Sequence, residues 1–244
     1  MVEAHQLTKA YPDLQTGQFI ALNQVSFQVS AGEIFGLLGP NGAGKTTALR
    51  ILSTVLKPTG GYARVNGFDV VTQPSEVRRQ IGFMSANTAV YDRMTAWEMV
   101  EYFGRLYGLQ DEPLRARMEE LFERLQMNEI RDVLGAKMST GMKQKVSIAR
   151  AIVHDPPVVI FDEPTSGLDP RSRRRLIDII GKTDMTAVIA THDLDMVLDV
   201  CKRVIIMNNG RIESDGEVPG VLCDIEYMRS CGLELPLSVA GRSS

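Results

Sequence analysis

The sequence has few cysteines, little net charge and no long apolar run, and each shortage excludes a class of protein. Its three cysteines, Cys201, Cys223 and Cys231, are odd in number and lack the close spacing of metal ligands, so we expect reduced thiols in a cytoplasmic protein. No run of about 18 apolar residues occurs, so no membrane-spanning helix is expected. The segment Met1–Tyr11 has no apolar centre, so it does not resemble a signal peptide.

The formal net charge is only −3 over 244 residues, so the chain has no overall positive field that would attract nucleic acid. A basic run does occur at Arg171, Arg173, Arg174 and Arg175, and we interpret it as a solvated helix face. Hydrophobic residues make up 44% and charged residues 23% of the chain, as in folded globular proteins. The length suits one large domain, or one domain with a subdomain.

Hydrophobic patterns in the first 60 residues predict short strands followed by one helix. Apolar alternation favours two strands, Val2–Leu7 and Ile20–Val29, joined by a hairpin loop at Thr16–Gln18. The apolar run Glu33–Leu38 has the length of a buried strand. The segment Lys45–Leu56 has helical spacing and ends before a cluster of proline and glycine.

From about Thr95 to Val133 the pattern becomes helical. One apolar stripe recurs there at helical spacing: Leu114, Met118, Leu121, Phe122 and Leu125. Helix and strand patterns then alternate through Lys143–His154, Val158–Phe161, Arg171–Ile180, Thr186–Ala190, Leu194–Val200 and Val204–Met207. The alternation is typical of βαβ units, so it predicts an α/β fold with a mainly parallel sheet, an N-terminal antiparallel β portion and an inserted helical subdomain.

A glycine-rich loop stands between the strand Glu33–Leu38 and the helix that begins at Lys45. Its sequence fits G-x-x-x-x-G-K-[ST], in the strand–loop–helix context that this P-loop motif requires. Glycines let successive N–H groups point at phosphate oxygens, at a helix N-terminus whose dipole favours anions. Lys45 is expected to reach the β- and γ-phosphates, and Thr46 to offer its hydroxyl to Mg²⁺. The residues expected to bind the nucleotide here are Gly39, Pro40, Asn41, Gly42, Ala43, Gly44, Lys45, Thr46 and Thr47.

Two acidic residues directly follow the apolar strand Val158–Phe161. Because parallel strands end at one edge of a sheet, this strand should deliver Asp162 and Glu163 to the edge where the phosphate loop lies. Asp162 can then hold Mg²⁺, directly or through water, and Glu163 can polarise the attacking water. Acidic residues after a strand are also common at helix N-termini, but the upstream phosphate loop and the downstream segment Pro164–Pro170 favour the catalytic interpretation.

The segment Met138–Gln144 resembles the signature motif of ABC transporter ATPases, whose pattern is L-S-G-G-x-x-x. The resemblance covers roughly residues 3–220 in the family's motif order, with Met138 and Thr140 as departures. It implies that Ser139 and the N–H of Gly141 contact the γ-phosphate of an ATP held by a second subunit. Without the family, Ser139 is simply a helix N-cap. The implied signature residues are Ser139, Thr140, Gly141, Met142, Lys143 and Gln144.

Three further positions have roles implied by the same resemblance. His192 resembles the switch histidine that bonds the γ-phosphate and supports Glu163, although a lone histidine after a strand is more often structural. Asp169 resembles the acid of a loop that crosses the dimer interface. Tyr11 resembles the aromatic residue that stacks on adenine, with an ordinary surface tyrosine as the alternative. The implied reaction is hydrolysis of ATP to ADP and phosphate, with Mg²⁺ as cofactor and with Glu163, His192 and Lys45 as catalytic residues.

One position departs from the family pattern. Members usually carry a glutamine after a strand like Ile81–Met84, where it touches Mg²⁺ and the attacking water, but Ala86 stands there. Asn87 is a candidate to supply an amide from the neighbouring position. This loop, together with Tyr91–Thr95 and Ser139–Lys145, is similar to the ATPases of sodium-efflux and related ABC-2-type exporters.

The resemblance also implies partners. The signature of one chain completes the site formed by the phosphate loop of another chain. Hydrolysis is therefore expected to need a homodimer, or a heterodimer with a second ABC ATPase, around two ATP. A separate transmembrane permease would hold this dimer at the inner face of the cell membrane, and no nucleic-acid partner is expected. Five aromatic residues suit either the core of the helical subdomain or a docking groove for a cytoplasmic helix of the permease: Tyr91, Trp97, Tyr102, Phe103 and Tyr107.

The expected organisation is a single ABC ATPase domain over residues 1–220, followed by a C-terminal tail of residues 221–244. Its core comprises residues 1–86 and 155–220, and its helical subdomain about 87–154. Two other functions stay open, namely a non-transport ABC ATPase in translation or repair and a nucleotide-gated regulatory module with weak turnover. The first usually has two ATPase domains or long coiled-coil insertions, and the intact Glu163 and His192 argue against the second.

Overall fold

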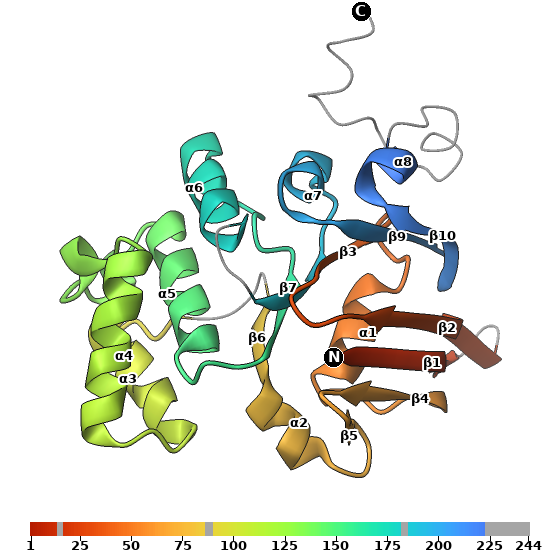
Figure 1. Cartoon of the computed structure of the whole chain (residues 1–244), viewed down its shortest axis with the longest axis horizontal. Coiled ribbons are helices and arrows are strands. Elements are labelled where there is room, and N and C mark those ends of the chain that lie inside the picture. Colours follow the sequence, from red (N-terminus) through yellow and green to blue (C-terminus); the bar gives the residue numbers. More distant parts are fainter. Residues whose placement is uncertain (14–16, 86–89, 182–184, 223–244) are drawn as a thin grey trace, which may run out of the picture.

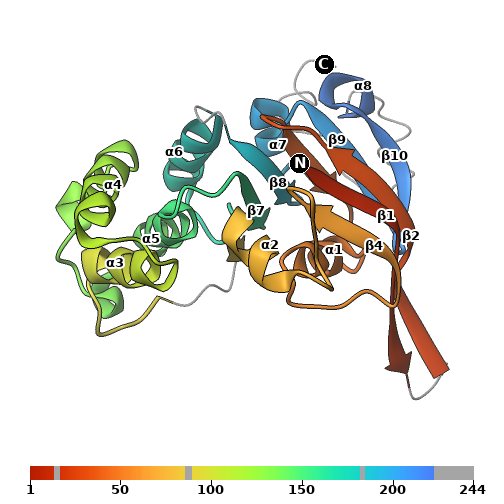
Figure 2. The ribbon, with the colours of Figure 1, turned by 60° about the horizontal axis from the view of Figure 1, so that its bottom comes forward.

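The chain folds around two sheets, which a computed structural model describes over residues 1–13, 17–85, 90–181 and 185–222. The smaller sheet is antiparallel and has the order β2–β1–β4–β5. Its strands are β1 (Val2–Asp13), β2 (Gly17–Val29), β4 (Gly60–Val65) and β5 (Phe68–Asp69). The far end of the β1–β2 hairpin extends away from the rest of the chain (Figure 2).

The hairpin is longer than the sequence pattern predicted. Apolar alternation ends at Leu7, but β1 continues to Asp13, and β2 begins at Gly17 rather than Ile20. The extra residues pair across the hairpin, with Tyr11 opposite Phe19, so cross-strand backbone pairing extends the strands beyond the apolar pattern. The predicted hairpin loop Thr16–Gln18 was wrong for Gly17 and Gln18, which pair with β1 as the first residues of β2, and Thr16 lies outside the described residues.

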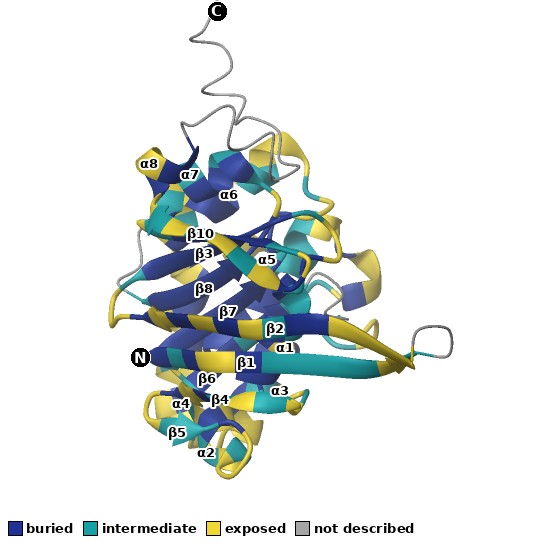
Figure 3. Ribbon diagram, turned by 90° about the vertical axis from the view of Figure 1, so that its right-hand side faces the viewer, coloured by how far each residue is buried: buried dark blue, intermediate teal, exposed yellow. Residues whose placement is uncertain are grey.

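The larger sheet is parallel except at one edge, and has the order β10–β9–β3–β8–β7–β6. Its strands are β3 (Ile34–Leu38), β6 (Ile81–Ser85), β7 (Val158–Asp162), β8 (Thr186–Ala190), β9 (Arg203–Asn208) and β10 (Arg211–Glu217). Every residue of β3, β7 and β8 is buried (Figure 3), as expected for parallel strands with both faces covered. The predicted mainly parallel sheet is confirmed.

Two helices precede the helical portion, α1 (Lys45–Leu52) and α2 (Pro74–Gln80). The prediction that the first helix reaches Leu56 was wrong. Thr54 takes a left-handed backbone with φ of 64°, and the N–H groups of Val55 and Leu56 both return to the carbonyl O of Arg50. This closure ends the helix while Leu56 still packs against the core.

Three helices lie together on one side of the sheets: α3 (Ala96–Leu106), α4 (Asp111–Arg124) and α5 (Thr140–Ile152) (Figure 1). Short 3₁₀ turns, Asn128–Ile130 and Gly135–Lys137, connect α4 to α5. The whole apolar stripe from Leu114 to Leu125 is buried, as its spacing predicted. The helix expected from Lys143 begins earlier, because Ser139 caps it.

The remaining helices are α6 (Pro170–Gly181), α7 (Leu194–Val200) and α8 (Val218–Leu222). The last of these was not expected, since no pattern was found after Val218.

The proposed division into core, helical subdomain and tail stays a prediction at its boundaries. In the part of the chain that is described, no helix combines the length and the apolar character needed to cross a bilayer.

Candidate nucleotide-binding site

The phosphate loop joins β3 to α1 and lies against neighbouring backbone. Gly39 has φ of 149° and Gly44 has φ of 104°, conformations that glycine adopts without a steric penalty. A Cβ at Gly39 would lie 2.2 Å from the carbonyl O of Met207, and a Cβ at Gly44 would lie 2.6 Å from that of Ala21. Both positions therefore require glycine, and the loop leads directly into a helix N-terminus whose dipole favours anions.

The Lys45 ammonium lies within this loop. Its Nζ donates to the carbonyl O of Gly39 at 2.6 Å and to that of Pro40 at 3.2 Å. Burial lowers the pKa of Lys45, while the negative charges of Glu163 and Asp162 oppose that shift. The loop thus places a largely buried lysine between two acidic residues and a helix N-terminus.

Thr46 and Asp162 bring two oxygen atoms together at the carboxyl edge of the parallel sheet. Thr46 Oγ1 donates to Asp162 Oδ1 at 3.0 Å, and only 7% of Asp162 is exposed. Burial raises the pKa of Asp162; the hydrogen bond from Thr46 opposes this shift, and the charge of Glu163 adds to it. Ser85, the last residue of β6, is the register partner of Asp162, so the next strand ends at the same place.

Glu163 turns sharply out of β7 and meets the loop after β8. Its backbone is left-handed with φ of 53°, and its N–H donates to the carbonyl O of Ala190 at 2.8 Å. Its Oε2 lies 2.8 Å from His192 Nδ1 and accepts a hydrogen bond from Thr191 Oγ1 at 3.2 Å. A left-handed non-glycine residue costs on the order of 1 kcal/mol, and such strain persists where surrounding contacts fix it. The two residues expected to act together are therefore in contact.

The residues beside this pair were not identified from the sequence. Asp193 follows His192, caps α7 by accepting from the N–H of Met196 at 3.0 Å, and accepts from Thr165 Oγ1 at 3.0 Å. Both oxygens of Asp193 also accept from the guanidinium of Arg173. The interpretation of the whole basic run as a solvated face is therefore wrong for Arg173, although the other three arginines are exposed. No local pattern marks this pair, because Arg173 and Asp193 meet only when α6 packs on α7.

The signature segment forms the N-terminus of α5. Ser139 Oγ accepts from the N–H of Met142 at 3.3 Å, so Ser139 is a helix cap as well as a candidate phosphate contact. A Cβ at Gly141 would lie 2.8 Å from Ser172 Oγ, so α5 and α6 approach closely there. Gln144 Nε2 donates to the carbonyl O of Pro164, in the loop after the two acids. Thr140 and Lys143 lie in the first turn of the same helix.

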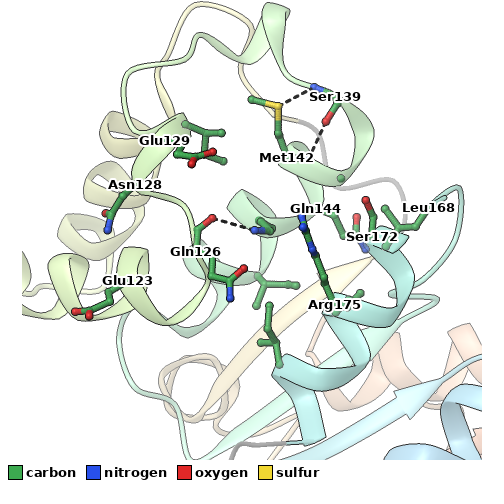
Figure 4. A pocket seen from close by; sticks show the side chains of 16 residues that line it. Glu123, Gln126, Asn128, Glu129, Ser139, Met142, Gln144, Leu168, Ser172 and Arg175 are labelled. Atoms are coloured by element: carbon green, nitrogen blue, oxygen red, sulfur yellow. Dashed lines mark hydrogen bonds between the residues drawn. The ribbon is translucent and has the colours of Figure 1, made fainter. Parts of the chain in front are cut away.

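A cavity of about 610 Å³ opens beside the signature, between α5, α6 and the segment after α4 (Figure 4). Ser139, Gly141 and Met142 line one part, with Leu168 and Ser172 beside them. No described residue of the phosphate loop lines this cavity. The signature and the phosphate loop of one chain therefore lie at separate places.

Asp169 and Tyr11 are the remaining predicted site residues that the structure describes. Asp169 precedes α6, and its Oδ1 accepts from the N–H groups of Arg171 and Ser172 at 3.0 and 3.1 Å. Hydrogen bonds from Ser172 hold the pKa of Asp169 below its usual value. Tyr11 lies in β1 with the Lys9 ammonium 5.1 Å from its ring centroid. Ala86 and Asn87 lie outside the described residues.

The five clustered aromatic residues divide between core and surface. Trp97 packs on Phe122 with ring centroids 5.0 Å apart, and Phe103 also packs against the core. By contrast Tyr91, Tyr102 and Tyr107 are exposed by 49%, 46% and 39%. The core interpretation therefore holds for two of the five, and three are left on the surface.

The fold and this constellation define a P-loop ATPase, with a phosphate loop after one parallel strand and paired acids after another. Beyond that class, the chain belongs to the ABC transporter family. The family model described as ABC transporter matches residues 22–166. The chain is thus an ATP-binding, ATP-hydrolysing protein of this family, whose cassettes work as dimers with membrane subunits.

Two relatives support the assignment to the ABC transporter family. The chain is 43% identical over 196 residues to the ABC transporter ATP-binding protein NatA of Bacillus subtilis, covering 79% of this chain and 80% of NatA. It is 39% identical over 203 residues to the doxorubicin resistance ATP-binding protein DrrA of Mycobacterium tuberculosis, covering 82% of this chain and 61% of DrrA. This chain therefore spans less than two thirds of DrrA.

A solved structure shows the same architecture. The dimeric, post-hydrolysis structure of the ATP-binding cassette MJ0796 bound to ADP and Pi superimposes with a TM-score of 0.80. Its sequence is 27% identical, and the match covers 89% of this chain and 99% of that chain. The expected ABC ATPase fold is confirmed.

Proposed function

We propose that two ATPase chains, at least one of them this protein, close around two ATP and drive a separate membrane permease by closing and reopening. One observation carries this proposal: Glu163 lies in contact with His192 beside Lys45 and Asp162, at the edge where the phosphate loop ends. The residues proposed as base, switch and phosphate-binding cation are thus close together. The separate signature cavity supports completion of each site by a second subunit.

The phosphate loop would bind ATP through its N–H groups and Lys45. Phosphate oxygens would replace the carbonyls of Gly39 and Pro40 as acceptors for the Lys45 ammonium. The low exposure of Lys45 strengthens its attraction to phosphate, because less water screens the charge. Tyr11, on the hairpin whose second strand contacts the loop, is proposed to stack on adenine.

The donor set beside the loop fits Mg²⁺. Thr46 and Asp162 offer two oxygen ligands within hydrogen-bond distance, and no group of three or more His, Cys, Asp or Glu with metal-site geometry occurs among the described residues. Mg²⁺ is usually held by one or two protein oxygens together with phosphates and water, so two protein ligands suffice. When bound, the ion neutralises charge on the phosphate oxygens. Asn87 stays a candidate for a further contact.

Glu163 is proposed as the base that orients and deprotonates the attacking water. His192, 67% exposed in its side chain, is held on Glu163 by one ring nitrogen, which leaves its other nitrogen for the γ-phosphate. Ser139 and the N–H of Gly141 would approach that phosphate from the second subunit. Asp169 precedes the helix that packs against the signature, which suits the proposed dimer-loop role.

The permease contact is proposed at the exposed aromatic face of the helical portion. The exposed apolar side chains of this portion include Tyr91, Tyr102 and Tyr107, together with Leu106, which is 63% exposed. Aromatic residues are enriched at the centres of interfaces, and a short amphipathic helix would cover such a face. If the proposal holds, Tyr102→Glu abolishes copurification with the permease but leaves the ATPase rate of the isolated chain unchanged.

The direction of transport is proposed to be export. The loop after Ile81–Met84 resembles those of sodium-efflux and ABC-2-type exporters, and a doxorubicin resistance ATP-binding protein is among the relatives. Membrane association through the permease would place the chain at the inner face of the membrane. Copurification with ribosomes or DNA in place of a membrane protein would contradict this assignment.

The test of the ATPase mechanism compares the wild type with Glu163→Gln, which keeps the shape of the side chain but removes the base. We expect the wild type to hydrolyse ATP and the variant to lose turnover while forming a dimer only with ATP, as seen by size-exclusion chromatography. An equal rate for the two proteins would refute the role of Glu163. ATP binding without turnover in the wild type would favour the nucleotide-gated regulatory module.

A further inference from the structure

Two successive arginines of α6 reach α7, and they contact opposite ends of that helix. Arg173 binds Asp193, the N-cap of α7, with both carboxylate oxygens. Arg174 Nη1 lies 2.8 Å from Oδ2 of Asp199, in the last turn of α7. Because Asp193 follows His192 directly, only the first ion pair reaches the loop that carries the switch histidine.

Hydrogen bonds connect Asp193 to the catalytic carboxylate. The N–H of Asp193 donates to Thr191 Oγ1 at 3.0 Å, and that hydroxyl donates to Glu163 Oε2 at 3.2 Å. Thr165, two residues after Glu163, donates its hydroxyl to Asp193 Oδ2. Thr165 and Arg173 thus hold the carboxylate of Asp193, while its N–H is connected through Thr191 to Glu163.

Burial makes this connection firmer than a surface ion pair. The side chain of Asp193 is 13% exposed and that of Arg173 is 29% exposed, whereas Arg174 and Asp199 are 64% and 41% exposed. Burial alone would raise the pKa of Asp193, but hydrogen bonds from Arg173 and from the N–H of Met196 outweigh it and hold that pKa below its usual value. Asp193 therefore stays charged and paired.

We propose that Arg173 is a positioning residue for ATP hydrolysis: by holding Asp193, it fixes the loop that places His192 and Thr191 against Glu163. The role rests on the proposed function. Since α6 begins directly after Asp169, the same side chain links the loop expected at the dimer interface to the switch histidine. A shift of α6 on dimer closure would then reach the catalytic carboxylate through Arg173.

The competing explanation is that Arg173 only ties α6 to α7. Arg174 provides the control, because its ion pair joins the same two helices but ends at Asp199, in the last turn of α7 and not in the loop of His192. A purely structural tie predicts that Arg173→Ala, which breaks the more buried pair, lowers Tm more than Arg174→Ala does, while kcat stays at the wild-type value in both variants. A positioning role predicts that only Arg173→Ala slows hydrolysis.

The experiment measures kcat, KM and Tm for the wild-type protein and for these variants, with binding of a fluorescent ATP analogue as a separate readout. We expect Arg173→Ala to lower kcat by about tenfold or more, because small misplacements of catalytic groups cost factors of this size, while KM changes by less than about twofold. Arg174→Ala should change neither by more than about twofold. Arg173→Lys, which keeps the positive charge but not the bidentate contact with Asp193, should recover part of the kcat lost in Arg173→Ala.

A double-mutant cycle tests the route of the effect. Asp193→Asn keeps an N-cap for α7 but weakens the contact with Arg173. If Arg173 acts through Asp193, the double variant loses little more rate than Arg173→Ala alone. If the rate losses of the two single variants multiply in the double variant, the two residues act independently and the proposal is overturned. Equal rates for Arg173→Ala and Arg174→Ala would also overturn it.

The two proposals fail differently. If Glu163→Gln hydrolyses ATP like the wild type, the catalytic assignment itself is refuted. If Glu163→Gln is inactive while Arg173→Ala matches the wild type, only the positioning role is refuted. Should Arg173→Ala have a lowered Tm, its kcat is measured well below that Tm, and a wild-type kcat there counts against the proposal.

Discussion

His154 lies just after α5, where its ring stacks on Tyr107 with centroids 3.5 Å apart. Its Nε2 lies 3.0 Å from the carbonyl O of Ile81, so the neutral ring can donate its proton there. Its Nδ1 is buried and has no hydrogen-bond partner within the described chain. A proton on Nδ1 would therefore be an unsatisfied buried donor, and burial lowers the pKa of His154 from 6.5 to about 4.

This lowering makes the free energy of unfolding depend on pH. Between pH 6.5 and about 4 the unfolded chain binds a proton at His154 that the folded chain does not, so stability falls as the pH falls. At about 1.4 kcal/mol for each unit of pKa difference, the full loss is about 3 kcal/mol, and at pH 5 it is about 2 kcal/mol. No loss from this group is expected above pH 7.

Urea unfolding of the wild type and of His154→Gln at pH 7.5, 6 and 5 measures the effect. Glutamine can donate to the carbonyl of Ile81 but does not titrate, so the difference in stability between the two proteins should shift by about 2 kcal/mol in favour of the variant between pH 7.5 and pH 5. A difference that stays constant with pH would refute the reasoning.

Two further predictions concern packing and burial. Phe122 is fully buried against Trp97, so Phe122→Ala should lower the free energy of unfolding by about 3–5 kcal/mol, whereas Leu106→Ala, at a 63% exposed position, should change it by less than about 0.5 kcal/mol in urea unfolding. Burial raises the pKa of the Cys201 thiol to about 12, so this thiol should be unreactive in the folded chain. In a variant whose other two cysteines are replaced by serine, a thiol-reactive dye should label Cys201 only after unfolding. Rapid labelling of the native variant would contradict this prediction.

The elements of the parallel sheet could be predicted because each is one short apolar run. In strands such as β7, which are buried on both faces, a whole run such as Val158–Phe161 is apolar, and the helix Leu194–Val200 matched its pattern residue for residue. By contrast β10 alternates between exposed and half-buried residues and holds four charged side chains, so it has no apolar run. Such a strand is stabilised by pairing with its neighbour, here β9, and a local sequence pattern carries no information about that pairing.

The site divides in the same way. Lys45, Thr46, Asp162 and Glu163 could be predicted to converge, because each lies at or after the end of a parallel strand and such strands end at one edge of the sheet. The contact of Arg173 with Asp193 depends on how α6 packs against α7, and helix spacing alone assigned that arginine to solvent. Contacts made by packing of distant segments are therefore the part that the sequence did not predict.

The central claim is that the phosphate loop of one chain works with the signature of another. Mixing two inactive variants tests it: Lys45→Ala disables the phosphate loop, and Ser139→Asp keeps the cap of α5 but sets a negative charge against the γ-phosphate. A mixed dimer holds one site with both defects and one intact site. The account predicts ATP hydrolysis by the mixture well above the sum of the separate variants, and a mixture no more active than that sum would contradict it.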